Sequence, residues 1–160
     1  MIFLEGLTKL QPVVTAEGTV TAGNASGIND GAAAVLIASE QVVEQYQLKP
    51  RAKIIASTAV GIEPRIMGFA PAPAIKKLLK QANLTLEQMD VIELNEAFAA
   101  QALAVTRDLG LADDTTQVNP NGGAIAIGHP LGASGARLVT TALNQLEQTG
   151  GTYALCSMCI

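Results

Sequence analysis

The sequence contains a single histidine, His129, and this residue lies in a loop rich in glycine. Glycines at positions 122, 123, 128, 132 and 135 flank it, which lets the backbone turn sharply and approach a ligand closely. Pro130 disfavours helical geometry at His129, so the sequence predicts a stiff, extended backbone there. An imidazole in this setting suits a general base working near neutral pH. A loop histidine without chemical function is the alternative, and the surrounding glycines argue against it.

A second candidate group is Asn95-Glu96-Ala97-Phe98, which directly follows a predicted buried strand and opens a predicted helix. Proteins of the α/β class bind ligands where strand ends meet helix starts. Asn95 has two interpretations. Its side chain could cap the helix, or its amide could fix a water molecule or polarise a carbonyl group.

The two cysteines, Cys156 and Cys159, have the spacing of a Cys-x-x-Cys redox or metal motif. Residues 152–160 are predicted to form a strand, in which successive side chains point to opposite faces. The two thiols would then point apart, and the sequence has no second Cys/His pair for zinc. We therefore expect one structural cysteine, one functional cysteine and no metal site. Spacing alone does not decide which cysteine is which.

Residues 21–31 form a second loop of small residues, ahead of another predicted strand. This loop is either a tight turn or a place where the backbone and Ser26 contact a ligand. Neither Ser26 nor Ser134 lies in a Gly-x-Ser-x-Gly elbow, which argues against a serine hydrolase. The histidine loop also lacks the glycine patterns that bind phosphates or dinucleotides.

The elements that must position these residues alternate between strand and helix, which is typical of an α/β fold. Strands are predicted at residues 31–38, 51–60, 91–94 and 152–160. Helices are predicted after Ser39, from Pro73, from about Glu96 to Leu109, and through Leu138 and Leu146 to Gly150. We expect a mixed β-sheet with helices on both faces.

The composition limits the partners of the chain. Hydrophobic residues make up 49% and charged residues 15% of its 160 residues, so part of the surface is expected to be covered, as in a homo-oligomer. A net charge of −4 argues against nucleic acid. No apolar run reaches the length of a membrane span. No signal peptide is visible and two cysteines make no disulfide framework, so we expect a cytoplasmic protein.

Four motifs, in chain order, resemble those of the thiolases, enzymes that make or cleave 3-ketoacyl-coenzyme A. They are Gly23–Gly27 with Asn29–Gly31, Asn95–Phe98, Gly122–Arg137 and Leu155–Ile160. The histidine loop is the most specific of them, and the match covers nearly the whole chain. The resemblance implies the C-terminal half of a thiolase-like fold. Residues 1–30 would end the substrate-binding loop region, and residues 31–160 would form a C-terminal domain truncated before its last strand.

The resemblance also implies roles for individual residues. His129 would activate the acyl-accepting cysteine and line an oxyanion hole, in which Asn95 would hold a water molecule. Cys159 would be the acid/base that moves the α-proton, whereas Cys156 has no role in the family pattern. Positions that match the pantetheine and acyl pocket of the family are Ser26, Met67 and Phe98.

Two parts of the family pattern are missing from this sequence. The nucleophilic cysteine belongs to the N-terminal half, and the glycine run expected after the Cys-Ile pair is not present because the sequence ends at Ile160. We therefore expect an acyl-CoA acyltransferase of the thiolase type, in the setting of fatty acid metabolism, that uses coenzyme A thioesters without a cofactor and is inactive as this chain alone. The alternatives are one chain of a split thiolase, complemented by an N-terminal half, and a non-catalytic acyl-CoA-binding or assembly remnant.

Overall fold

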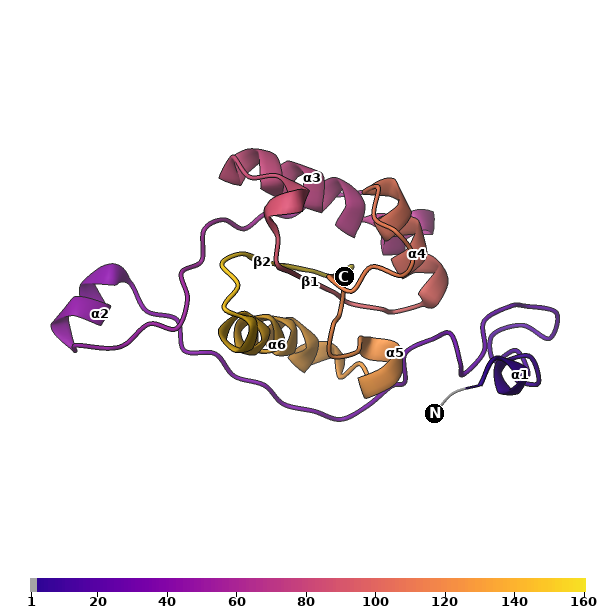
Figure 1. Ribbon diagram of the computed structural model, residues 1–160. Coiled ribbons are helices and arrows are strands. Elements are labelled where there is room, and N and C mark those ends of the chain that lie inside the picture. Colours follow the sequence, from indigo (N-terminus) through magenta and orange to yellow (C-terminus); the bar gives the residue numbers. More distant parts are fainter. Residues whose placement is uncertain (1–2) are drawn as a thin grey trace.

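The computed structural model describes residues 3–160, and these form three layers with a short parallel sheet in the middle (Figure 1). The sheet pairs β1 (Val91–Leu94) with β2 (Ala154–Ser157). Helices α3 (Pro71–Ala82) and α4 (Ala99–Asp108) cover one face, and α6 (Leu131–Thr149) covers the other. The shorter elements are α1 (Leu4–Leu7), α2 (Glu40–Gln45), α5 (Ala124–Ile127) and the 3-10 helices η1 (Pro64–Phe69) and η2 (Leu86–Gln88).

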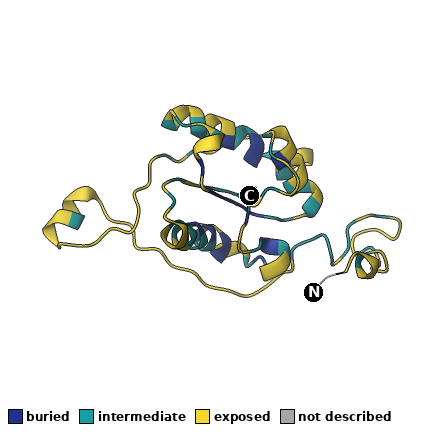
Figure 2. Cartoon of the chain, viewed as in Figure 1, coloured by how far each residue is buried: buried dark blue, intermediate teal, exposed yellow. Residues whose placement is uncertain are grey.

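The main hydrophobic core lies between the sheet and the α3–α4 layer. Ile92 and Leu94 of β1 and Leu155 of β2 are buried against Ile75 of α3 and Val105 of α4. Full burial of side chains of this size stabilises a fold by about 1.5–3 kcal/mol each. Figure 2 shows the buried residues concentrated on the strands and on the helix faces that contact them. The α/β class with helices on both faces is therefore confirmed.

Two of the four predicted strands are wrong. Residues 31–38 and 51–60 are extended, but within residues 3–160 neither segment pairs with a named strand. Their apolar side chains are largely exposed, as at Leu36 (90%) and Ile54 (66%). An extended apolar segment becomes a strand only when a neighbour accepts and donates its ladder hydrogen bonds. Figure 1 shows this part of the chain running around the outside of the body, with α2 projecting from it.

The observed sheet is parallel, whereas the sequence predicted a mixed one. Val91 pairs with Ala154 and Leu94 with Ser157, over the whole length of both strands. Parallel neighbours require a long crossover connection, and here that crossover contains α4, α5 and α6. The other edge of β1 carries a parallel bridge from Ile92 to Val118, so β1 is hydrogen-bonded on both sides.

Two helix ends lie at the residues where the sequence predicts them, Ser39 and Gly150. Ser39 Oγ accepts a hydrogen bond from the Val42 amide at 3.3 Å and caps α2 as predicted. Gly150 ends α6 with a φ of 71°, a left-handed conformation that glycine adopts without strain. The helix expected to begin near Glu96 begins at Ala99 instead. In the described part of the chain, no helix combines the length and the apolar character that crossing a membrane requires.

Candidate functional site

Both ring nitrogens of His129 are hydrogen-bonded. Nδ1 lies 2.6 Å from Ser134 Oγ, and Nε2 lies 3.2 Å from Asn95 Nδ2. Ser134 donates its hydroxyl proton to the Pro130 carbonyl at 3.0 Å, so it must accept from the Nδ1–H of His129. The lone pair is thereby placed on Nε2, where the Asn95 amide donates to it. This neutral tautomer is the form in which a histidine can act as a base through Nε2.

Two residues from the N-terminal part of the sequence, Ile28 and Asn29, hold the backbone of His129. Ile28 bridges to His129 as a parallel β-bridge, and the His129 amide donates to Asn29 Oδ1 at 3.1 Å. Gly128, with a φ of 95°, makes this approach possible, because a Cβ there would lie 2.6 Å from Asn29 Oδ1. The extended backbone predicted at His129 is thus confirmed, and Asn29 supplies its anchor.

Asn95 lies at the carboxyl end of β1 and is completely buried. The N-cap of α4 is Phe98, so the capping interpretation of Asn95 is wrong. The Asn95 backbone amide donates to the Ser157 carbonyl at 2.9 Å, which ties Asn95 to the end of β2. Its side-chain Oδ1 has no hydrogen-bond partner in residues 3–160. Asn95 therefore offers a fixed amide to His129 and a free buried acceptor beside it.

A residue that the sequence did not single out, Asn119, holds this end of β1 in place. Its side chain accepts from the Leu94 amide at 2.9 Å and donates to the Leu94 carbonyl at 2.8 Å and to Glu96 Oε1 at 3.0 Å. Its own amide donates to the Ile92 carbonyl at 2.9 Å. Asn119 also has a φ of 48°, which asparagine tolerates better than most residues. The Asn119-Pro120-Asn121 start of the histidine loop was the available signal.

Replacing Asn119 with alanine is expected to destabilise the fold by about 2–4 kcal/mol, because two buried backbone groups of Leu94 lose their partner. Asn121→Ala is the matched control: Asn121 is exposed and bonds only to Gln145 Oε1 among the described residues, so its loss should cost about 0.5 kcal/mol or less. Urea unfolding followed by circular dichroism measures both. Equal effects of the two substitutions would contradict the role given to Asn119.

The structure brings the Ser26 loop against the Asn95–Phe98 motif. The Ser26 amide and hydroxyl both donate to the Ala97 carbonyl, at 3.0 and 3.1 Å, and Ala25 bridges to Phe98. Phe98 and Met67 are each 45% exposed. Met67 lies in η1, which packs against α4. The three residues matched to the substrate pocket therefore flank the start of α4, although no hydrogen bond in the described residues joins them to His129.

The two cysteines are free and lie in different surroundings. Cys156 is in β2, paired in register with Glu93, and burial together with the Glu93 carboxylate raises the pKa of its thiol to about 12. Cys159 follows the end of β2 and is buried, which raises the pKa of its thiol. Cys159 thus leaves the sheet at the same edge as Asn95. Within residues 3–160, no hydrogen bond links it directly to His129.

Burial shifts the pKa values of Glu93 and His129. Glu93 is fully buried, and desolvation raises its pKa to about 7 against the opposing effect of Arg137. Burial lowers the pKa of His129, and the positive charge of Arg137 lowers it further. A lowered pKa keeps the imidazole unprotonated, and therefore available as a base, at neutral pH.

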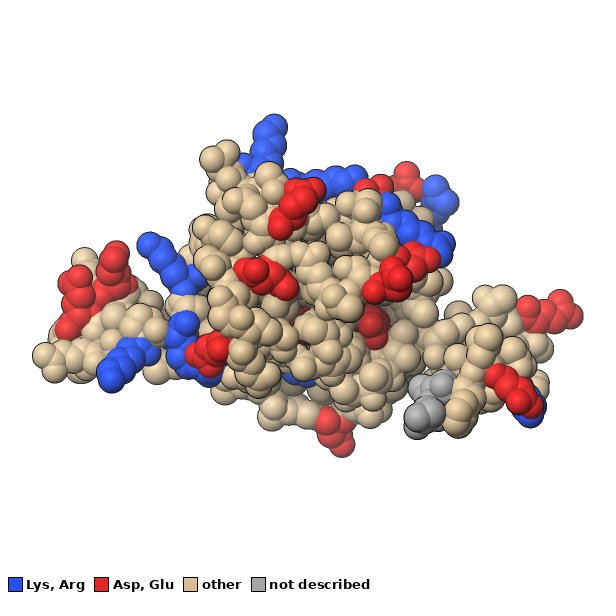
Figure 3. Space-filling view, viewed as in Figure 1, with Lys and Arg blue, Asp and Glu red and all other residues tan. Residues whose placement is uncertain are grey.

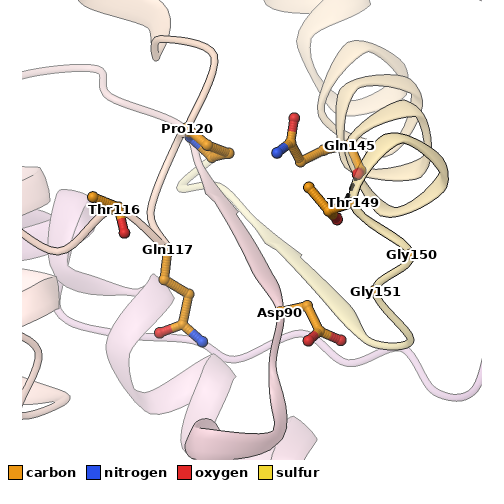
Figure 4. Close-up of a pocket in the computed structure, with 8 residues that line it drawn as sticks. All are labelled: Asp90, Thr116, Gln117, Pro120, Gln145, Thr149, Gly150 and Gly151. Carbon is orange, nitrogen blue, oxygen red and sulfur yellow. Dashed lines mark hydrogen bonds between the residues drawn. The ribbon is translucent and has the colours of Figure 1, made fainter.

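A pocket of about 500 Å³ opens at the opposite edge of the sheet, at the amino ends of the strands (Figure 4). Asp90, Gln117 and Gly151 line it, and Asp90 Oδ2 accepts from the Thr152 and Tyr153 amides at 2.6 and 2.9 Å. The Asp90 carboxylate is thus engaged in holding the residues that lead into β2. Across residues 3–160, no set of three His, Cys, Asp or Glu side chains is grouped so that it could hold a metal ion.

The fold matches solved thiolase structures, and the sequence matches models of the thiolase family. The family model "Thiolase, C-terminal domain" matches residues 48–160, and "Thiolase, N-terminal domain" matches residues 1–41. The chain belongs to the thiolase family, and its fold is that of the C-terminal portion.

Named relatives agree with this assignment. Beta-ketoadipyl-CoA thiolase of Acinetobacter baylyi is 87% identical over 157 residues, which cover 98% of this chain and 39% of that protein. The enzyme of the same name from Pseudomonas knackmussii is 60% identical over 157 residues, which again cover 98% of this chain and 39% of that protein. The structure of human mitochondrial 3-ketoacyl-CoA thiolase in complex with CoA matches with a TM-score of 0.94 and 52% identity, covering 99% of this chain and 40% of that one. The chain therefore spans about two fifths of the length of these relatives.

Proposed function

We propose that this chain is the C-terminal part of a thiolase-type acyltransferase that cleaves beta-ketoadipyl-CoA, or a 3-ketoacyl-CoA of the same chemistry, with coenzyme A. The observation that carries the proposal is the hydrogen-bond chain from Asn95 through His129 to Ser134, which leaves a basic Nε2 at the carboxyl edge of the sheet. The identity of 87% to the Acinetobacter baylyi enzyme supports the substrate, in preference to fatty acid metabolism.

In thiolysis, a cysteine thiolate attacks the 3-keto carbon, the C2–C3 bond breaks, and the acetyl-CoA enolate takes up a proton. The thiol of coenzyme A then attacks the acyl-enzyme and regenerates the thiolate. In the first half, His129 Nε2 removes the proton from the nucleophilic cysteine. That proton then passes to the Cys159 thiolate left by protonation of the enolate, so Nε2 is free to remove the proton of coenzyme A in the second half. Once protonated, Nε2 also donates toward the oxyanion, together with a water molecule held by Asn95. Each fixed donor accelerates such a reaction by about 10²–10³-fold.

Cys159 is the proposed acid/base at C2. Its raised thiol pKa keeps the proton on sulfur at neutral pH, so the thiol can give that proton to the enolate when the C2–C3 bond breaks. In the condensation direction the same sulfur takes the α-proton. The pantetheine arm and the acyl group would contact Ser26, Met67 and Phe98.

The acyl-accepting cysteine is proposed to lie in the part of the relatives that this chain does not cover. The partners are accordingly acyl-CoA, coenzyme A, and either further copies in a homo-oligomer or a complementing N-terminal half, in the cytoplasm. We also propose residues 1–30 as the end of the substrate-binding loop region and residues 31–160 as the C-terminal domain. Charged side chains are interspersed with broad uncharged areas on the face seen in Figure 3, which fits a chain that packs against other protein.

The 160-residue chain alone is expected to show no thiolysis above background, because an acyl-enzyme requires a thiolate within reach of a base. A chimera in which this chain replaces the matching 39% of the Acinetobacter baylyi enzyme is expected to consume beta-ketoadipyl-CoA. Loss of substrate absorbance in the presence of coenzyme A measures both. Turnover by the isolated chain above a Cys159→Ser control would contradict the proposal that the acyl-accepting cysteine lies outside this chain.

The same assay separates the alternatives. A split thiolase would regain activity when the two parts are expressed as separate chains. A binding remnant would bind coenzyme A in a chimera that never turns over, and that outcome would reject the catalytic proposal.

A further inference from the structure

Glu96 lies in the Asn95–Phe98 motif but has no role in the proposed reaction. Both oxygens of its carboxylate are nevertheless hydrogen-bonded. Oε1 accepts from Asn119 Nδ2 at 3.0 Å, and Oε2 accepts from the Ile125 amide at 3.2 Å. These partners are 23 and 29 residues away in sequence. The Glu96 bridge, meaning these two hydrogen bonds, therefore joins the end of β1 to the histidine loop.

The Ile125 amide needs a partner from outside its own helix. It lies in the first turn of α5, where backbone amides have no carbonyl of the same helix to donate to. The N-cap residue, Gly123, has no side chain that could accept from it. Glu96 takes over this capping role from a distant element, and it thereby fixes the start of α5.

Gly123 provides the space that the Glu96 carboxylate occupies. A Cβ at position 123 would collide with the Glu96 carboxyl group. The φ of Gly123 is −97°, a value that other residues also adopt, so backbone conformation does not require glycine there. The need for room beside Glu96 is therefore the physical reason for a glycine at this position.

The Glu96 bridge lies next to the contact that holds the catalytic base. Asn95 directly precedes Glu96, and its Nδ2 lies 3.2 Å from His129 Nε2. His129 follows Ile125 by four residues. Two neighbouring side chains at the end of β1 thus reach the histidine loop at two points. A single contact would leave the loop free to pivot, whereas two contacts fix its position relative to Asn95.

We propose that Glu96 is a positioning residue for His129: its carboxylate fixes α5 to the end of β1 and so holds Nε2 against the Asn95 amide. The inference deepens the proposed function, since it rests on Nε2 acting as the base. A carboxylate is required because it accepts at both oxygens. A glutamine of the same shape would turn an NH₂ group toward one of the two donors, Asn119 Nδ2 or the Ile125 amide.

Glu96→Gln in the chimera is expected to lower the single-turnover acylation rate by at least ~10-fold, because small displacements of a reacting group are costly. The KM for the thioester should change by less than about twofold, since Glu96 is not proposed to bind substrate. Glu44→Gln is the matched control. Glu44 is exposed on α2, which projects from the body of the chain, and its substitution should leave acylation unchanged.

Gly123→Ala tests the same bridge from the other side, because the added methyl group displaces the Glu96 carboxylate. It should also lower acylation by at least ~10-fold. In a Glu96→Ala background it should cost less than about twofold more, since the bridge is already lost. Gly61→Ala is the control, because a Cβ there meets nothing within 4 Å. Additive losses from Gly123→Ala and Glu96→Ala would contradict a shared role.

Imidazole ¹⁵N resonances of the 160-residue chain report the contact without turnover, because His129 is its only histidine. A hydrogen bond donated to an unprotonated imidazole nitrogen moves its resonance upfield. Glu96→Gln should therefore move the Nε2 signal downfield while the ring is neutral, whereas Nδ1, which donates to Ser134, should keep its signal. A substitution that only lowered stability would move neither signal in the folded protein.

Parental acylation by folded Glu96→Gln, or an Nε2 signal that stays in place, would overturn the proposal. If Glu96→Gln does not fold, Glu96→Asp decides by the same criteria, because it keeps the charge but is one methylene too short to reach both partners. A parent chimera without turnover would reject the proposed function. The NMR measurement would still decide whether Glu96 holds the imidazole, so the two failures are distinguishable.

Discussion

His129→Ala is expected to lower the rate of enzyme acylation in the chimera by at least ~10²-fold while leaving the fold intact. The substitution removes the Nε2 lone pair that takes the thiol proton and a donor to the oxyanion. The ring is held by Asn95 and Ser134, not packed at the centre of the hydrophobic core, so its loss should not unfold the chain. Release of the first product from beta-ketoadipyl-CoA in a single turnover measures acylation directly.

Asn121→Ala, on the surface of the same loop, is the control for this measurement and should acylate at the parental rate. Circular dichroism and the urea midpoint verify that His129→Ala is folded. Near-normal acylation by the folded variant would refute the assignment of His129 as the base.

Cys159→Ser is the second substitution with a large expected effect. Condensation of acetyl-CoA with succinyl-CoA, the reverse of the proposed cleavage, should fall by at least ~10²-fold, because a serine hydroxyl is far less acidic than a thiol and cannot carry the α-proton. Acyl transfer onto the nucleophilic cysteine should persist, since that step uses His129. Incorporation of a labelled succinyl group into protein, measured beside the condensation rate, separates the two steps.

Cys156→Ser is the matched control, with the same chemical change three residues earlier. Cys156 pairs in register with Glu93 in β2, and its thiol, with a pKa of about 12, stays protonated. Condensation should fall by less than about threefold. Comparable losses from Cys156→Ser and Cys159→Ser would show that the two cysteines do not have separate roles.

Sequence patterns located the parts of the site that depend on local chemistry. Pro130 and the glycines around His129 predicted an extended, closely approachable backbone, and residues 91–94 were placed correctly as a buried strand. Ser39 and Gly150 marked helix ends because caps are set by neighbouring residues. The α/β class followed from the alternation of such elements.

Parts that depend on distant partners were missed. Residues 31–38 look like a buried strand, but strand pairing is a property of two segments, and the sequence of one does not reveal it. From the sequence, Asn119 is predicted only as a turn residue. The structure shows its hydrogen bonds to the backbone of Leu94. Glu93 lies in an apolar run, and no local pattern predicts that its carboxylate is fully buried without a hydrogen-bond partner among residues 3–160.

The way the site is tied together has a consequence for how the chain folds. Contacts at His129 join residues 100 apart in sequence through Asn29, 34 apart through Asn95, and only 5 apart through Ser134. The Ser26 loop closes onto Ala97 over 71 residues. Because long loops must close before such contacts form, folding slows as sequence separation grows. We therefore expect the local His129–Ser134 pair to form before the contacts to Asn95 and Asn29. On that expectation, the base reaches its working position only when the most distant loop closes, near the end of folding.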